Sequence, residues 1–223
     1  MPEFVPVLAI DGPSGSGKGT IARLLAKEFA WHLLDSGAVY RVLAWYALVD
    51  GCALDDVTKL AQLAQKLPVE FKDSMVILAG KDVSLDIRTE KCGEAASKIA
   101  VYPEVRSALL ARQRAFSQPP GLVADGRDMG TVVFPEAFLK IYLDASAEER
   151  AKRRFLQLKE SGYSGNLQDL AAEIMQRDLR DKSRAVAPLK PAVDAVVIDS
   201  SSMQITEVFQ EIASLTRQRL SKF

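Results

Sequence analysis

The sequence predicts an α/β protein with a five-stranded parallel sheet flanked by helices. Five short apolar runs each end on an aspartate, at residues 7–11, 31–35, 122–125, 141–144 and 195–199. Helical patterns lie between most of them, and such alternation is typical of a parallel sheet covered on both faces. Ligands bind beyond the carboxyl ends of such strands. The five aspartates are therefore expected on the ligand side, although for most of them a cap or turn role is the simpler expectation.

Size and composition exclude several function classes. The chain has 223 residues, 48% of them hydrophobic, which suits one α/β domain with an insertion. A formal net charge of zero argues against general nucleic-acid or membrane-surface binding. No stretch approaches the ~20 apolar residues of a membrane span, and no signal peptide is evident, so a cytoplasmic location is expected.

A glycine-rich loop follows the first predicted strand and precedes a helical pattern. It consists of Gly12, Pro13, Ser14, Gly15, Ser16, Gly17, Lys18, Gly19 and Thr20. In this context backbone N–H groups and a helix N-terminus surround a phosphate, and the lysine adds positive charge. The loop therefore predicts binding of a nucleoside triphosphate. Gly19 stands where the usual pattern has a hydroxyl, which leaves Thr20, or Ser16 within the loop, to supply one.

Two basic helices are predicted near the C-terminal side of the chain. Ser146 and Glu149 fit a capping box that begins a helix running to about Lys159, and a second helix runs from about 167 to 184 after a glycine-containing break at 162–166. Residues 150–190 hold ten basic and five acidic side chains, a local charge of +5. Such a pair could form a lid over polyphosphate, or simply a solvated, salt-bridged surface.

Two other regions have distinct patterns. Alternating residues at 69–71 and 83–87, with a turn at 79–82, predict a small β-rich insertion. A final helix is predicted near 204–220, where Ile205, Val208, Phe209, Ile212 and Leu215 form an apolar stripe that is most simply core.

Among proteins with a phosphate loop, the sequence favours small-molecule kinases. A GTPase would need an Asn-Lys-x-Asp motif, but the single asparagine, Asn166, is followed by Leu167. Phosphoryl transfer depends on arginines that neutralise the moving phosphoryl. Arg41 follows the second predicted strand, and Arg127 and Asp128 follow the third.

The chain resembles bacterial cytidylate kinases, a family of nucleoside-monophosphate kinases. The resembling segments are 12–20, 35–41, 88–97 (RTEKCGEAAS), 106–116 (RSALLARQRAF), 125–135 (DGRDMGTVVFP) and 177–189 (RDLRDKSRAVAPL). The glycine after Lys18 is usual in this family. The resemblance implies a single P-loop kinase domain with a core at about 1–50, 97–148 and 186–223, a monophosphate-binding insertion at about 51–96 and a lid at about 149–185.

The resemblance also implies substrates and residue roles. ATP would bind the loop, with Arg150 and Arg154 of the lid, and Mg²⁺ would accompany it at Thr20. Catalytic roles fall to Lys18, Arg127, Arg177 and Arg184. CMP or dCMP would bind Ser36, Arg41, Ser97, Arg106, Arg127, Asp128, Arg177, Asp181 and Arg184.

Within the acceptor set, the implied roles divide by substrate group. Ser97, Arg106 and Asp128 would read cytosine. Three arginines would bind the acceptor phosphate, namely Arg41, Arg127 and Arg184. Arg177 and Asp181 would read the ribose, and Ser36 would line the same pocket. The family resemblance further implies a monomer, and the net charge of zero argues against nucleic-acid or membrane partners.

Two alternatives remain at this point. The chain could phosphorylate another monophosphate or small molecule, because the phosphate loop and lid are widely shared. It could also be a non-catalytic nucleotide-binding regulator, which would bind ATP without acceptor-dependent turnover.

Overall fold

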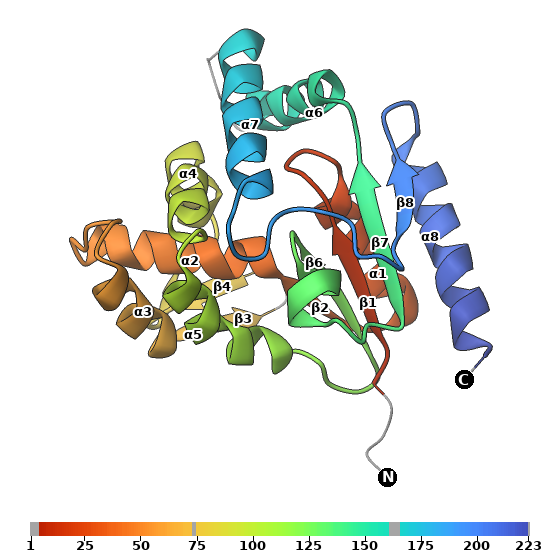
Figure 1. The fold of residues 1–223 in the computed structure, drawn as a ribbon, viewed down its shortest axis with the longest axis horizontal. Helices are drawn as coiled ribbons and strands as arrows, with labels where there is room; N and C mark the ends of the chain where they lie inside the picture. The colour runs from red at the N-terminus through yellow and green to blue at the C-terminus, as the bar shows by residue number, and fades with distance from the viewer. Residues whose placement is uncertain (1–4, 73–74, 161–165, 223) are drawn as a thin grey trace. The chain divides into compact units, whose positions relative to one another are not determined.

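In the computed structural model, residues 5–72, 75–160 and 166–222 are described (Figure 1). The chain forms two compact units. The larger one contains the residues up to 34 and those from 116 onward, and the smaller one contains residues 35–115. Among the described residues, no helix is both long enough and apolar enough to cross a membrane.

The larger unit is built on a five-stranded parallel sheet, as predicted. The strand order is β2-β6-β1-β7-β8. The strands are β1 (Val7–Asp11), β2 (His32–Asp35), β6 (Leu122–Gly126), β7 (Leu139–Asp144) and β8 (Val196–Asp199). Every residue of β1 and β6 is buried, as expected for central strands covered on both faces. The register places Asp11 opposite Gly126 on one side and Tyr142 on the other, so these strands end at the same edge.

One face of this sheet is covered by α1 (Lys18–Phe29) and α8 (Ile205–Leu220) (Figure 1). Leu25 of α1 and Ile212 of α8 pack with Ile10 in a single apolar cluster. The predicted stripe on the last helix is therefore core, except at its first residue: Ile205 is 54% exposed.

The two basic helices form a hairpin-like pair, α6 (Ala147–Glu160) and α7 (Leu167–Lys182), joined by a small apolar cluster of Ala151, Leu170 and Ile174. Half of the predicted capping box is present, because the Oγ of Ser146 accepts the N–H of Glu149 at 3.2 Å. The N–H of Ser146 donates to Oγ of Ser201 at 2.8 Å rather than to Glu149. Most of the predicted break at 162–166 lies outside the described residues. α7 ends two residues before the predicted position, so Arg184 lies beyond the helix rather than on its face.

The described residues of the smaller unit form four α-helices and a small sheet. The helices are α2 (Ser36–Val49), α3 (Val57–Gln65), α4 (Glu90–Ile99) and α5 (Pro103–Arg114). α2 packs against α4, and α3 packs against α5. The antiparallel sheet has the order β3-β4-β5, with β3 (Val69–Lys72), β4 (Met75–Leu78) and β5 (Lys81–Asp82).

This sheet confirms the β-rich insertion but corrects its details. The turn begins at Ala79 as predicted but is complete at Gly80, because both residues take left-handed φ values, 48° and 82°. Lys81 and Asp82 form β5 instead of the rest of the turn, and β4 before the turn was not predicted as a strand. Residues 83–87 are not a strand. The Asp82 carboxylate accepts the N–H of Ser84 at 2.9 Å. Val83 still donates to the carbonyl of Val76 in β4 at 2.9 Å, and the chain then enters the 3₁₀ helix η1 (Asp86–Arg88).

Candidate active site

The glycine-rich loop connects β1 to α1, which begins at Lys18. The side chain of Lys18 is buried, and its Nζ donates to the carbonyl of Pro13 at 2.8 Å. A Cβ on Gly12 would lie 2.1 Å from the carbonyl oxygen of Leu143, so the end of β7 packs directly on the loop backbone. Only glycine fits that approach, and the loop is therefore held against the sheet edge.

The position of Gly19 has a steric cause. A Cβ there would lie 3.1 Å from Oδ2 of Asp125, the aspartate near the end of β6. A larger residue after Lys18 would require that carboxylate to shift slightly. The hydroxyl lies one residue later, at Thr20, whose side chain is exposed on the first turn of α1.

A buried cluster of opposite charges brings together the three arginines of the larger unit that were predicted to bind the acceptor, Arg127, Arg177 and Arg184. Asp181 is 1% exposed. It accepts from Nε of Arg127 at 3.0 Å and is paired with Arg184, which reaches it from beyond the end of α7. Burial alone would raise the pKa of Asp181, but the charges of Arg127, Arg184 and Arg177 hold it below its ordinary value. Sequence reasoning identified all four residues.

The loop after β6 is fixed by a contact that sequence reasoning did not assign. Arg127 and Asp128 lead into the π-helix η2 (Met129–Val133). Both oxygens of Asp11 accept backbone N–H groups from this helix, Oδ1 from Met129 at 2.7 Å and Oδ2 from Gly130 at 2.8 Å. The only sequence signal was the place of Asp11 at a strand end, directly before the glycine loop.

The lid arginines occupy different environments. Arg150 is buried, donates to the carbonyls of Ala145 and Ser14, and pairs with Asp178 on α7 at 2.6 Å. Arg150 therefore links both lid helices to the phosphate loop. Arg154 instead donates to the exposed Gln157 at 2.7 Å.

A further arginine on α6 was not singled out from the sequence. Arg153 donates to the carbonyl of Ser200 at 2.6 Å and to the carbonyl of Ser16 at 3.5 Å. It thus joins α6 to the phosphate loop and to the segment after β8. Like Asp178, it lay within a basic helical run whose individual partners are distant in the sequence.

The other predicted acceptor residues lie in the smaller unit, and two of them are on α2. Ser36 is buried and its hydroxyl donates to Oε1 of Gln113 at 2.8 Å, a partner that sequence reasoning missed. Arg41 donates to the carbonyl of Ile87 at 3.0 Å. A Cβ added to Gly93 would lie 3.2 Å from the guanidinium of Arg41, so this group packs directly on the backbone of α4. Both side chains are thus held by neighbours within their own unit.

Ser97 on α4 and Arg106 on α5 are both buried. Arg106 donates to the carbonyl of Ala100 at 3.3 Å and lies 5.9 Å from the centre of the Tyr40 ring. The hydroxyl of Ser97 has no hydrogen-bond partner within the part of the chain that the structure describes. A buried hydroxyl without a partner is costly, which suits a group that binds a ligand.

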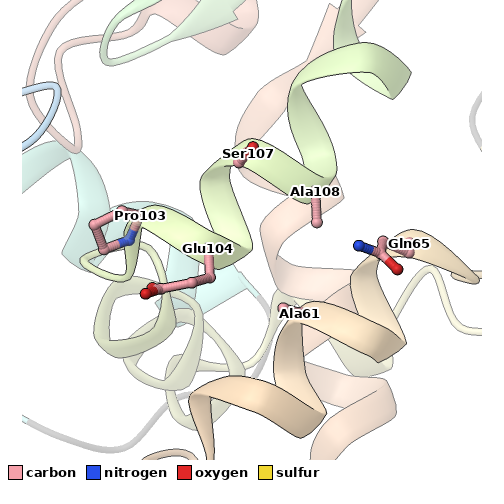
Figure 2. A pocket seen from close by; sticks show the side chains of 6 residues that line it. All are labelled: Ala61, Gln65, Pro103, Glu104, Ser107 and Ala108. Atoms are coloured by element: carbon pink, nitrogen blue, oxygen red, sulfur yellow. The ribbon is translucent and has the colours of Figure 1, made fainter.

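A separate pocket of about 720 Å³ lies in the smaller unit between α3 and α5 (Figure 2). Its lining contains Ala61, Gln65, Pro103, Glu104, Ser107 and Ala108. None of the predicted site residues is among them. The candidate active site is therefore defined by the phosphate loop and the charged cluster rather than by this pocket.

The comparison with known proteins decides the family. A family model described as cytidylate kinase matches residues 8–218. The chain belongs to the cytidylate kinase family. The cytidylate kinase of Aeromonas hydrophila is 58% identical, covering 99% of this chain and 97% of its own length. Those of Edwardsiella ictaluri and Salmonella arizonae are 55% and 54% identical, each over 99% of this chain and 100% and 99% of their own lengths.

Within this cytidylate kinase fold, Arg150 should contribute more to stability than Arg154. Replacing Arg150 with Met leaves Asp178 buried without its cation, which typically costs ~3–5 kcal/mol. Arg154→Met is the matched control and should change the free energy of unfolding by less than ~1 kcal/mol. Urea unfolding of the two variants measures both values. Equal losses would contradict the role given to Arg150.

Asp11 should make the stability of this kinase fold depend on pH. Burial raises the pKa of Asp11 from 3.8 to about 7, although the N–H groups of Gly130 and Met129 lower it. The unfolded side chain ionises near 3.8, so folding takes up a proton between these values. The contribution of Asp11 to the free energy of unfolding is therefore greatest below the unfolded pKa of 3.8, and it is lost as the pH rises through about 7.

We therefore expect the free energy of unfolding to fall relative to that of Asp11→Asn as the pH rises through this window. The slope should reach at most ~1.4 kcal/mol per pH unit, the value for one proton. Urea unfolding of both proteins at a series of pH values measures it. Parallel pH curves would show that the ionisation of Asp11 is not linked to folding.

Proposed function

We propose that the chain transfers the γ-phosphoryl group of ATP to CMP, giving CDP and ADP. One observation carries this proposal. The chain belongs to the cytidylate kinase family, and its larger unit contains both a phosphate loop and the arginine cluster around Asp181. Phosphoryl transfer needs its substrates held in line and its charge neutralised, with little covalent chemistry from the protein. These two features supply those requirements.

The donor half of the site is the glycine-rich loop. Its N–H groups and the N-terminus of α1 bind the ATP phosphates, and Lys18 adds a positive charge. Arg154 contacts ATP directly. Arg150 serves the donor site by fixing the loop, since it already donates to the carbonyl of Ser14 at 3.1 Å.

The acceptor phosphate binds to arginines whose positions are set in advance. Arg127 and Arg184 are both paired with buried Asp181, so their guanidinium groups need little reorganisation when the phosphate arrives. Arg41 completes the phosphate contacts, and Arg177 with Asp181 binds the ribose. The acceptor is already anionic, so no general base is required.

Cytosine is read by Ser97, Arg106 and Asp128, and Ser36 lines the acceptor pocket. The unsatisfied hydroxyl of Ser97 supports this role, as does the burial of Asp128, which is 3% exposed. A carboxylate can accept from the exocyclic amine of cytosine. Uracil presents an oxygen there, and a buried carboxylate facing it would lose its partner, which makes the site discriminating.

Mg²⁺ accompanies ATP in this proposal. In kinases this ion is held by one or two protein oxygens together with substrate phosphates and water, rather than by a protein cage. The described residues fit that mode. They contain no cluster of three or more acidic, histidine or cysteine ligands, and Thr20 lies on the turn against which Asp125 rests. Thr20 would supply the hydroxyl, and the bound ion would neutralise charge on the phosphates.

Four finer points belong to the same proposal. dCMP is accepted along with CMP, the insertion at about 51–96 serves the acceptor and the lid at about 149–185 serves the donor. The protein acts as a monomer, as the family resemblance implies.

The acceptor specificity tests the function directly. We expect ATP-dependent ADP release with CMP and dCMP, and much slower release with UMP, AMP or GMP. A coupled assay with each acceptor at equal concentration measures this. A preference for UMP or AMP would overturn the cytosine assignment, and ATP binding without turnover of any acceptor would indicate a regulator.

Asp128→Asn should weaken discrimination rather than donor binding. An amide can donate to O4 of uracil, so we expect the CMP-to-UMP ratio of kcat/KM to fall by about ten-fold or more. The KM for ATP should stay within about two-fold. Asp199→Asn, at the end of β8, is a control that should leave the ratio unchanged. An unaltered ratio in a folded Asp128 variant would show that this residue does not read the base.

A further inference from the structure

Asp11 makes an unusual pair of contacts for a strand-end aspartate. Asp35, Asp144 and Asp199 also end strands, but each bonds to a backbone N–H within three residues of itself. Asp11 instead accepts from Met129 and Gly130, which are 118 and 119 residues away in the sequence. Both of its carboxylate oxygens are used. Asp11 therefore joins two separate segments rather than capping its own turn.

The two segments that Asp11 joins serve different substrates. On one side, Asp11 directly precedes Gly12, where the donor loop begins. On the other, the amides it binds directly follow Arg127 and Asp128, which carry acceptor functions under the proposed function. One carboxylate thus fixes the acceptor loop to the strand that leads into the donor loop.

The geometry leaves the acceptor loop little freedom. The backbone of Asp11 is opposite Gly126 in the parallel register of β1 and β6. Its side chain holds Met129, only three residues further on, at 2.7 Å. Arg127 and Asp128 therefore lie between Gly126, the strand partner of Asp11, and Met129, which the side chain of Asp11 binds. The directions of the Arg127 and Asp128 side chains therefore depend on the contact between Asp11 and η2.

The burial of Asp11 makes the contact hard to replace. Its side chain is 4% exposed, so water cannot take over as the acceptor for the two N–H groups. An asparagine offers one oxygen and one NH₂ group in the same space, so its NH₂ would face one of the N–H donors. That donor would lose its partner, and the first turn of η2 would shift.

We propose that Asp11 is a positioning residue that aims Arg127 and Asp128 at the acceptor nucleotide. The inference rests on the proposed function for the identity of that nucleotide. It assigns Asp11 no contact with substrate. Its effect should therefore be seen on acceptor binding and base discrimination, and much less on ATP, because the donor loop has independent contacts to Leu143 and Arg150.

Steady-state kinetics of Asp11→Asn test this inference. At about pH 8, above the pKa of about 7, we expect the KM for CMP to rise by about ten-fold and the CMP-to-UMP ratio of kcat/KM to fall. The KM for ATP should change by less than about two-fold. Asp199→Asn is the matched control, since it also removes a strand-end carboxylate bonded to a backbone N–H, and it should leave both KM values unchanged.

Two outcomes would overturn the inference. One is an unchanged KM for CMP with unchanged discrimination in a folded variant. The other is an equal rise in the KM values for ATP and CMP, which would indicate general damage to the sheet edge. If Asp11→Asn does not fold, Asp11→Ser, which also removes the carboxylate but adds no bulk, carries the same expectations.

Amide hydrogen exchange of the unaltered protein gives a test that is independent of activity. The amides of Met129 and Gly130 should exchange as slowly as those of the central strands. Exchange as fast as in exposed loops would contradict the contact itself. Failure to phosphorylate CMP would instead overturn the proposed function while leaving this exchange result intact, so the two failures are distinguishable.

Discussion

The larger unit depends on one constraint, the shared carboxyl edge of its parallel sheet. Because β1, β6 and β7 run in the same direction and in register, their final residues meet at one place. The donor loop leaves β1 there, the loop with Arg127 leaves β6, and the carbonyl of Leu143 in β7 packs against Gly12. A sheet with one of these strands reversed would carry one of these groups to the opposite edge.

Buried charge is the second feature of this edge, and its energetics explain the arrangement of the arginines. An ion buried without a partner costs several kcal/mol or more, so a buried carboxylate that stays ionised needs a cation beside it. Asp181 is matched by Arg127 and Arg184, and Asp178 by Arg150. These pairs hold guanidinium groups in fixed directions before any phosphate binds, which is how preorganised charge lowers a barrier.

The sequence predicted most elements because their signals are local. Apolar runs and helical periodicity gave all five strands of the parallel sheet, both basic helices and the last helix. The errors in element boundaries arise where single residues take conformations or contacts that the sequence pattern does not show. The hairpin turn was predicted over four residues, but Ala79 takes a left-handed conformation that alanine rarely adopts and the turn is complete at Gly80. The strands on either side of it, at 75–78 and 81–82, were therefore missed. α7 likewise stopped at Lys182, and Arg184 reached Asp181 from outside the helix.

The candidate site likewise has features that local sequence predicts and features that only the fold determines. By itself the sequence determined the phosphate loop, the family and the identity of the charged residues, because these depend on residue type and short spacing. Only the tertiary structure decided which partners those residues have: Asp178 for Arg150, Gln113 for Ser36, and the amides of η2 for Asp11. Such partners lie tens to more than a hundred residues apart, and no local pattern encodes them. They are selected because a buried polar group must find a partner wherever the packed chain places one.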